Sequence, residues 1–163
     1  MKRRNFLLFG IAALGATVIP LRISAKSPME GEMEFEKMEL SDAEWKKRLT
    51  AEQYYILREE GTEKPHSSIL NKEKRKGVYA CAGCDLPLFT SEMKYDSGTG
   101  WPSFYTSIPG RIETKVDFKL ILPRTEYHCA KCGGHHGHVF NDGPKPTGKR
   151  YCNNGIALKF IAS

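Results

Sequence analysis

The sequence predicts a compact, mainly β domain of antiparallel strands with two short helices on its N-terminal side. Short apolar–polar alternations follow residue 77, Gly and Pro separate them, and two helix-start motifs precede them. A two-residue alternation is typical of strands with one face on a core and one in water. The 163 residues are 40% hydrophobic and 27% charged, which is enough for one domain with its own core.

Residues 1–25 have the three-part layout of an export signal, with a basic start, an apolar run over 6–21 and small residues near the end. The run is shorter than the ~20 residues that span a bilayer comfortably, so an uncleaved membrane anchor is the minor alternative. The pair Arg3-Arg4 resembles the twin-arginine signal of bacteria, and an ordinary secretory signal is the other interpretation. We therefore expect a signal peptide and export to the bacterial periplasm.

The charge of the chain gives no reason to expect a nucleic-acid partner. The net charge is +6, and residues 1–25 hold four basic residues and no acidic one, which leaves +2 for the rest. No basic stripe remains after the signal is removed. We expect neither nucleic-acid binding nor stable membrane insertion of the mature protein.

Residues 26–40 are acidic and without periodicity, and we interpret them as a flexible tether before a single domain over 41–163. Ser41 to Glu44 and Thr50 to Gln53 match the capping box, in which a hydroxyl and an acid or amide three residues later bond each other's backbone N–H groups. Each match predicts the start of a helix. The second helix should end by Gly61, with loop over 62–76.

The clearest strand pattern lies between residues 111 and 122. Six uncharged residues alternate there with charged ones, and we expect these six to face the core: Ile112, Thr114, Val116, Phe118, Leu120 and Leu122. Shorter strands are expected at 77–80, 137–140 and 155–161.

Four of the five cysteines form two Cys-x-x-Cys pairs, Cys81 with Cys84 and Cys129 with Cys132. Two such pairs at a domain-sized separation are typical of a structural zinc site, where four thiolates saturate a tetrahedral ion. Two disulfides or a redox pair are the alternatives in an oxidising compartment, although a redox motif needs only one pair. We expect one Zn²⁺ per chain that stabilises the fold and does no chemistry.

Cys152 is the cysteine left over. It is either a small buried hydrophobe or a nucleophile. If residues 150–154 are extended, Arg150, Cys152 and Asn154 project from one face. A neighbouring cation and amide favour the thiolate, so we expect a lowered pKa and a reactive thiol.

Three of the five histidines, His135, His136 and His138, fall within six residues. A lone cysteine with a histidine cluster elsewhere in the chain predicts a nucleophile with acid/base partners. Extra metal ligation or plain surface are the alternatives for these histidines.

Five segments resemble, in order, the motifs of the B-type methionine sulfoxide reductases, which act on the R sulfoxide. The resemblance runs from about Ser41 to Phe160 over EQYYILREEGTEKP, GVYACAGCDLPLF, YDSGTGWPSF, YHCAKCGGHHGHVFNDGP and RYCNNGIALKF. It implies two antiparallel sheets with a zinc on the four paired cysteines. It also implies that Cys152 attacks the sulfoxide sulfur of methionine-R-sulfoxide in oxidised proteins or peptides and becomes a sulfenic acid.

The resemblance implies roles for the residues around this cysteine as well. His135 and His138 would donate protons to the sulfoxide oxygen, with Asp142 and Asn154 orienting. His136 stands where the family more often has an apolar residue, and we give it no role.

Arg150 would hold Cys152 as a thiolate by the same resemblance. Trp101 would form the aromatic wall for the substrate's S-methyl group, and a plain core tryptophan is its alternative. Many members have a recycling cysteine where this chain has Thr99. An external thiol reductant, thioredoxin-like or other, would then have to reduce the sulfenic acid.

Two other classes of function stay open beside a peptide-methionine (R)-S-oxide reductase. One is a zinc-ribbon-like binding module without catalysis. The other is a thiol–disulfide oxidoreductase.

Overall fold

The computed structural model describes residues 35–119 and 122–163. The predicted signal peptide, residues 1–25, and most of the predicted tether lie outside this part. Within it, no helix has the length and apolar character needed to cross a membrane. Residues 35–40 form neither helix nor strand, but Phe35, Met38 and Leu40 pack against the core. This end of the predicted flexible tether is therefore attached to the domain.

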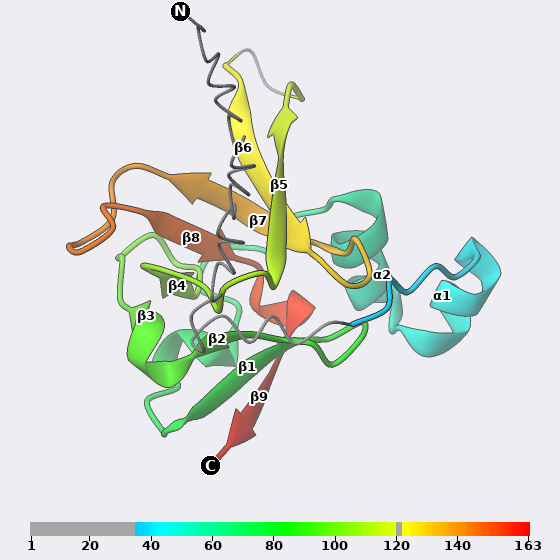
Figure 1. The fold of residues 1–163 in the computed structure, drawn as a ribbon, viewed down its shortest axis with the longest axis horizontal. Coiled ribbons are helices and arrows are strands. Elements are labelled where there is room, and N and C mark those ends of the chain that lie inside the picture. The colour runs from blue at the N-terminus through cyan, green and yellow to red at the C-terminus, as the bar shows by residue number, and fades with distance from the viewer. Residues whose placement is uncertain (1–34, 120–121) are drawn as a thin grey trace, which may run out of the picture. The chain divides into compact units, whose positions relative to one another are not determined.

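Two helices begin where the capping boxes predict them (Figure 1). Helix α1 spans Asp42–Arg48 and α2 spans Ala51–Glu59. At the start of α2, the Gln53 backbone N–H donates to Thr50 Oγ1 at 3.1 Å and the Thr50 N–H donates to Gln53 Oε1 at 3.2 Å. Glu60 then ends α2 in the left-handed conformation with φ of 54°, so the helix stops before Gly61 as expected.

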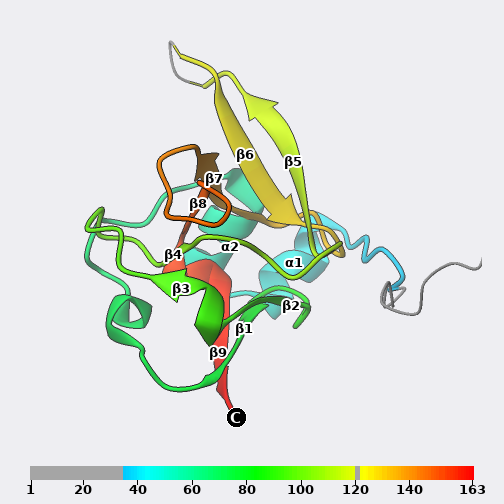
Figure 2. The ribbon, with the colours of Figure 1, turned by 60° about the vertical axis from the view of Figure 1, so that its left-hand side comes forward.

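Within residues 35–119 and 122–163, nine strands form two antiparallel sheets, which confirms the predicted fold class (Figures 1 and 2). The small sheet has the order β2-β1-β9, with β1 at Gly77–Cys81, β2 at Pro87–Thr90 and β9 at Leu158–Ala162. The large sheet has the order β3-β4-β8-β7-β6-β5. Its strands are β3 (Lys94–Tyr95), β4 (Ser103–Phe104), β5 (Ile112–Asp117), β6 (Arg124–Cys129), β7 (His135–Phe140) and β8 (Arg150–Asn153).

Three short 3-10 turns complete the described elements. They are η1 (Ile69–Lys72), η2 (Ser91–Met93) and η3 (Gly155–Ala157). The strand expected over 155–161 therefore begins later, since η3 occupies its first residues. The turn connects β8 of the large sheet directly to β9 of the small one.

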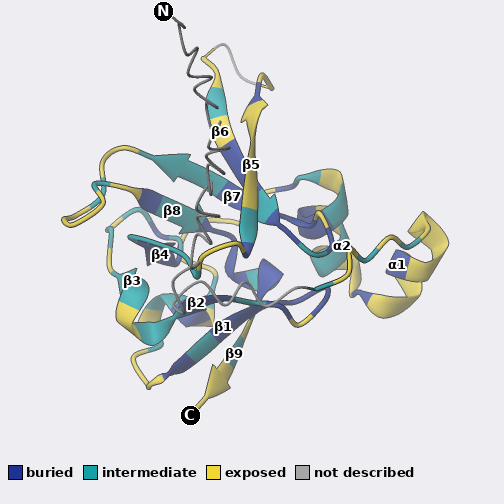
Figure 3. Ribbon diagram, in the orientation of Figure 1, coloured by how far each residue is buried: buried dark blue, intermediate teal, exposed yellow. Residues whose placement is uncertain are grey.

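An aromatic core holds the two sheets together, and Figure 3 shows buried segments in both sheets. Phe89 and Phe104 are stacked with ring centroids 4.1 Å apart, and Tyr79 meets Phe104 edge-on at 5.0 Å. Trp45 from α1 and Ile56 from α2 are each 1% exposed and belong to the same core. Burial of these large side chains is the main source of stability for such a domain.

The prediction that the apolar side of this strand faces the core holds at Ile112, which packs against the core, but it is wrong for the residues that follow. Leu120 lies outside the described residues. Strand β5 ends at Asp117, and Val116 and Phe118 are 58% and 76% exposed while Asp117 is 8% exposed. β5 is the edge strand, and its last residues run past the core together with β6 (Figure 1). The alternation showed correctly which side chains share a face, but not which face is covered.

Candidate active site

Cys152 lies in the middle of the large sheet. It is half-buried on β8, directly opposite Ser103 of β4 and His138 of β7. Residues opposite each other in antiparallel strands project to the same face. The pairing therefore brings the predicted nucleophile and one predicted acid/base residue together, and it confirms the extended conformation expected around Cys152.

A bulge in β7 determines where the other histidines point. Tyr127 pairs with Gly137 and His128 with His135, which leaves His136 as an extra residue. His135 therefore shares the face of His138, with ring centroids 5.6 Å apart. His136 turns into the core, is fully buried and stacks on Tyr127, and burial lowers its pKa to about 3. His136 is therefore an uncharged residue of the core, and we give it no role in the chemistry.

Most of the residues predicted for catalysis and substrate binding line a single cavity of about 290 Å³. Its walls include Trp101, His138, Arg150, Cys152 and Asn154. Two predicted residues contact these walls without lining the cavity. His135 is buried with Nδ1 2.9 Å from Glu126 Oε1, and Asp142 pairs with Arg150.

The His138 ring is fixed by a carboxylate that sequence reasoning missed. His138 Nε2 lies 2.7 Å from Asp117 Oδ2, which also accepts from Arg124 Nη2 at 2.6 Å. The backbone N–H of Lys119 holds the pKa of Asp117 well below its usual range, and His138 and Arg124 act in the same direction. Asp117 is therefore ionised at neutral pH beside the imidazole. Only the pairing of β5, β6 and β7 reveals this, because in sequence Asp117 belongs to the polar side of the strand.

Arg150 is held rigidly beside Cys152. Its Nε and Nη2 each donate to the Asp142 carboxylate at 2.8 Å, and its guanidinium lies 4.3 Å from the centre of the Phe140 ring. A bidentate pair of this kind fixes the plane of the guanidinium.

The expected lowering of the Cys152 pKa is wrong in its net direction. Burial raises the pKa of the thiol above its usual value of 9.0, because the charged form loses solvation. The Arg150 charge and a hydrogen bond from Thr99 lower it, as the sequence predicted for Arg150, but burial outweighs both. The sequence predicted that Arg150 lies beside Cys152, but it did not predict how deeply the Cys152 thiol is buried.

A buried carboxylate behind the cavity was also missed by sequence reasoning. Glu63 accepts hydrogen bonds from the backbone N–H groups of Gly155 at 2.7 Å and Ile156 at 3.0 Å. Its own backbone accepts from Trp101 Nε1 at 3.1 Å and donates to Asn154 Oδ1 at 3.0 Å. The loop residue Glu63 therefore holds two cavity walls, Trp101 and Asn154, to the turn that follows β8.

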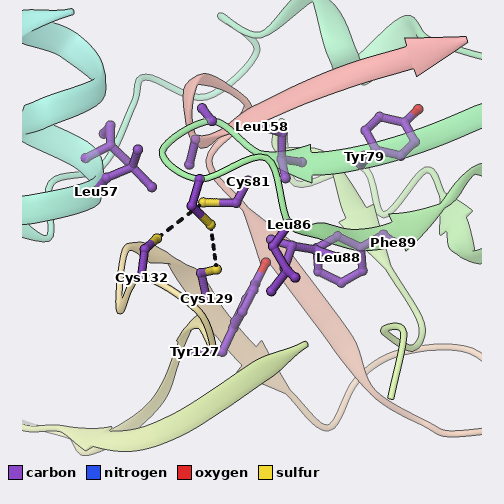
Figure 4. Packing of buried hydrophobic residues seen from close by; sticks show 14 of the residues in the cluster. Leu57, Tyr79, Cys81, Leu86, Leu88, Phe89, Tyr127, Cys129, Cys132 and Leu158 are labelled. Atoms are coloured by element: carbon purple, nitrogen blue, oxygen red, sulfur yellow. Dashed lines mark hydrogen bonds between the residues drawn. The ribbon is translucent and has the colours of Figure 1, made fainter. Parts of the chain in front are cut away.

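The four paired cysteines meet in a second, separate cluster. Their sulfurs lie within 4.8 Å of one another, with Cys81 and Cys132 at 3.7 Å and Cys84 and Cys129 at 3.4 Å. Figure 4 shows three of them pointing toward one another. Sulfurs about 2.3 Å from a tetrahedral zinc would lie about 3.8 Å apart, so the buried set fits a closed metal site. A disulfide requires about 2.05 Å.

Known proteins are similar in sequence to this chain over nearly the whole domain. The SelR domain family matches residues 49–162. "Peptide methionine sulfoxide reductase B1, chloroplastic" of Arabidopsis thaliana is 51% identical over 154 residues, covering 91% of this chain and 76% of that protein. "Peptide methionine sulfoxide reductase MsrB" of Methanosarcina barkeri is 54% identical over 124 residues, covering 76% and 87%. The chain belongs to the MsrB family.

A third relative has the same extent of similarity. The MsrB of Leptospira interrogans is 54% identical over 121 residues, which cover 74% of this chain and 92% of that protein. The MsrB-family match includes both sheets, the cysteine cluster and the cavity around Cys152. The individual roles predicted for the cavity residues remain predictions.

The rate of Cys152 alkylation in this MsrB-family chain should depend on pH, and this dependence reports how burial and the Arg150 charge shift the pKa of the thiol in opposite directions. With iodoacetamide, we expect a midpoint above pH 9.0, because burial raises the thiol pKa. Arg150→Met should move the midpoint higher still, since the guanidinium lowers that pKa. Mass spectrometry of the Cys152 peptide measures the rate at each pH.

Lys149→Met is the matched control, because the Lys149 ammonium binds Asn141 at 2.6 Å. It should leave the midpoint unchanged. A wild-type midpoint below pH 9.0, or a downward shift in Arg150→Met, would contradict this account of the site.

Proposed function

We propose that this protein reduces methionine-R-sulfoxide in peptides and proteins to methionine and so repairs oxidised methionine. The observation that carries the proposal is the direct pairing of Cys152 with His138 at one cavity, in a chain about 50% identical to peptide methionine sulfoxide reductases. A zinc-ribbon-like binding module would not need such a cavity, and a thiol–disulfide oxidoreductase would need a second thiol near Cys152.

The proposed step moves one oxygen atom and two electrons. The Cys152 sulfur attacks the sulfoxide sulfur while the sulfoxide oxygen takes up a proton. The oxygen then passes to Cys152 and methionine leaves, so the substrate sulfur is reduced and Cys152 is oxidised to a sulfenic acid. His138 can accept the thiol proton of Cys152 and deliver it to the oxygen, so a raised thiol pKa is compatible with attack.

The surrounding residues would position the substrate and the proton. Asp117 holds the His138 ring through Nε2, and His135 packs beside it. Trp101 offers an aromatic wall for the S-methyl group, a favourable sulfur–aromatic contact. Arg150, oriented by Asp142, would stabilise the thiolate as it forms, and Asn154 would help to position the cavity wall through its hydrogen bond with the Glu63 backbone.

One turnover should leave a sulfenic acid that nothing in the same chain resolves. Thr99 stands beside Cys152 and the other four sulfurs are clustered elsewhere, so an external thiol must regenerate the enzyme. Without reductant, we expect a burst of about one methionine per chain and a dimedone adduct on Cys152. Turnover should then follow the concentration of added thiol.

The controls for this burst are two variants. Cys152→Ser should release no methionine, while Thr99→Ser should keep the burst. A disulfide between Cys152 and a Cys-x-x-Cys cysteine after turnover, found by mass spectrometry, would show that the scheme is wrong.

We further propose that the cysteine cluster binds one structural Zn²⁺ per chain. Structural zinc contributes about 10–16 kcal/mol in small zinc domains, which is comparable to the whole stability of a domain of this size. Cys81→Ser and Cys129→Ser should therefore lose both the metal and the folded state, measured by metal analysis and circular dichroism. Cys152→Ser is the control and should keep both. A stable, metal-free Cys81→Ser protein with full activity is the contrary result.

We also propose that residues 1–25 direct export to the periplasm through the twin-arginine route and that cleavage leaves a mature end near Lys26. The basic start with Arg3-Arg4 and the apolar run support this. Changing both arginines to Lys should abolish export, measured by fractionation and N-terminal sequencing. Normal export of that variant would favour an ordinary secretory signal, and an intact N-terminus in the membrane would favour an anchor.

A further inference from the structure

A second groove adjoins the active-site cavity at the start of β6 and the end of β7. It has a volume of about 700 Å³, and its walls include Leu122, Val139 and Phe140. Arg124 and Phe140 line both this groove and the cavity around Cys152. A chain that places one side chain in the cavity can therefore continue directly into the groove.

One large apolar side chain of the groove stays exposed. Leu122 is 76% exposed, whereas Val139 packs partly against the core and Phe140 lies opposite Arg150 on β8. Val116 and Phe118 leave further exposed apolar surface at and just after the end of β5, which is visible in Figure 3. Exposed apolar surface beside a cavity typically marks a binding site.

The cations next to the groove are already paired. The Arg150 guanidinium lies 4.3 Å from the centre of the Phe140 ring and forms an ion pair with Asp142. Arg124, between cavity and groove, is already bound to the Asp117 carboxylate, so it offers little free charge to a partner.

We propose that this groove binds the apolar residues that flank an oxidised methionine in an extended substrate chain. The inference rests on the proposed function and adds a substrate preference to it. Successive residues of an extended chain advance about 3.3 Å, so the residues next to the sulfoxide lie over the groove when its side chain fills the cavity. The preferred substrate is then methionine-R-sulfoxide within an exposed, unfolded, apolar segment.

The test compares three substrates with dithiothreitol as reductant. Two are extended peptides of equal length with one methionine-R-sulfoxide, flanked on both sides by Leu and Val or by Ser and Gln, and the third is N-acetyl-methionine-R-sulfoxide. Wild type should prefer the apolar peptide. Leu122→Asp should lower kcat/KM for that peptide about tenfold, mainly through KM, because one apolar contact is lost. The N-acetyl compound should be unaffected.

Two further variants make the result specific. Leu122→Gln removes the apolar contact without adding charge and should give a smaller loss in the same direction. Ile69→Asp is the matched control, since Ile69 is 87% exposed and lines neither the cavity nor the groove. It should behave as wild type, and circular dichroism should show all variants folded.

The outcomes separate this inference from the function on which it rests. Wild type inactive on all three substrates would overturn the proposed reductase function. Activity with no preference between the peptides, or an equal loss for all substrates in Leu122→Asp, would overturn the groove alone. A Leu122→Asp variant with normal peptide kinetics but a raised KM for a thioredoxin-type reductant would assign the groove to the reductant and would overturn the inference.

Discussion

The meeting of the two Cys-x-x-Cys turns is the contact on which the rest of the structure depends. One turn follows β1 of the small sheet and the other follows β6 of the large sheet, so the cluster of Cys81, Cys84, Cys129 and Cys132 joins the two sheets. The helices attach to the same turns. Arg48 donates to the Gly83 carbonyl at 2.6 Å, and Arg58 donates to the Cys132 carbonyl at 2.9 Å. A metal held there would stabilise sheets and helices together.

The geometry of the active site depends on β6, the strand that ends at Cys129 of this cluster. β6 sets the register of β7, the bulge in β7 turns His136 inward, and His138 then lies opposite Cys152 on β8. A slip of one residue would move every one of these side chains to the other face of the sheet. The chemistry of the cavity therefore depends on the pairing of central strands rather than on a flexible loop.

Local patterns predicted much of this from the sequence. The capping boxes gave both helix starts, because a cap is satisfied within four residues. The cysteine spacing gave the cluster, and the motifs of the family gave the cavity. The apolar face of β5, the roles of Asp117 and Glu63 and the direction of the Cys152 pKa could not be predicted in the same way. Each depends on which surfaces cover which others, and no short pattern carries that information.

The central claim is that Cys152 reduces the R epimer of methionine sulfoxide. Chiral chromatography of a racemic N-acetyl-methionine sulfoxide mixture, treated with the protein and dithiothreitol, tests it most directly. The account predicts complete loss of the R epimer, an untouched S epimer, and no reaction with a folded Cys152→Ser variant. Consumption of both epimers, or activity that survives in Cys152→Ser, would contradict it.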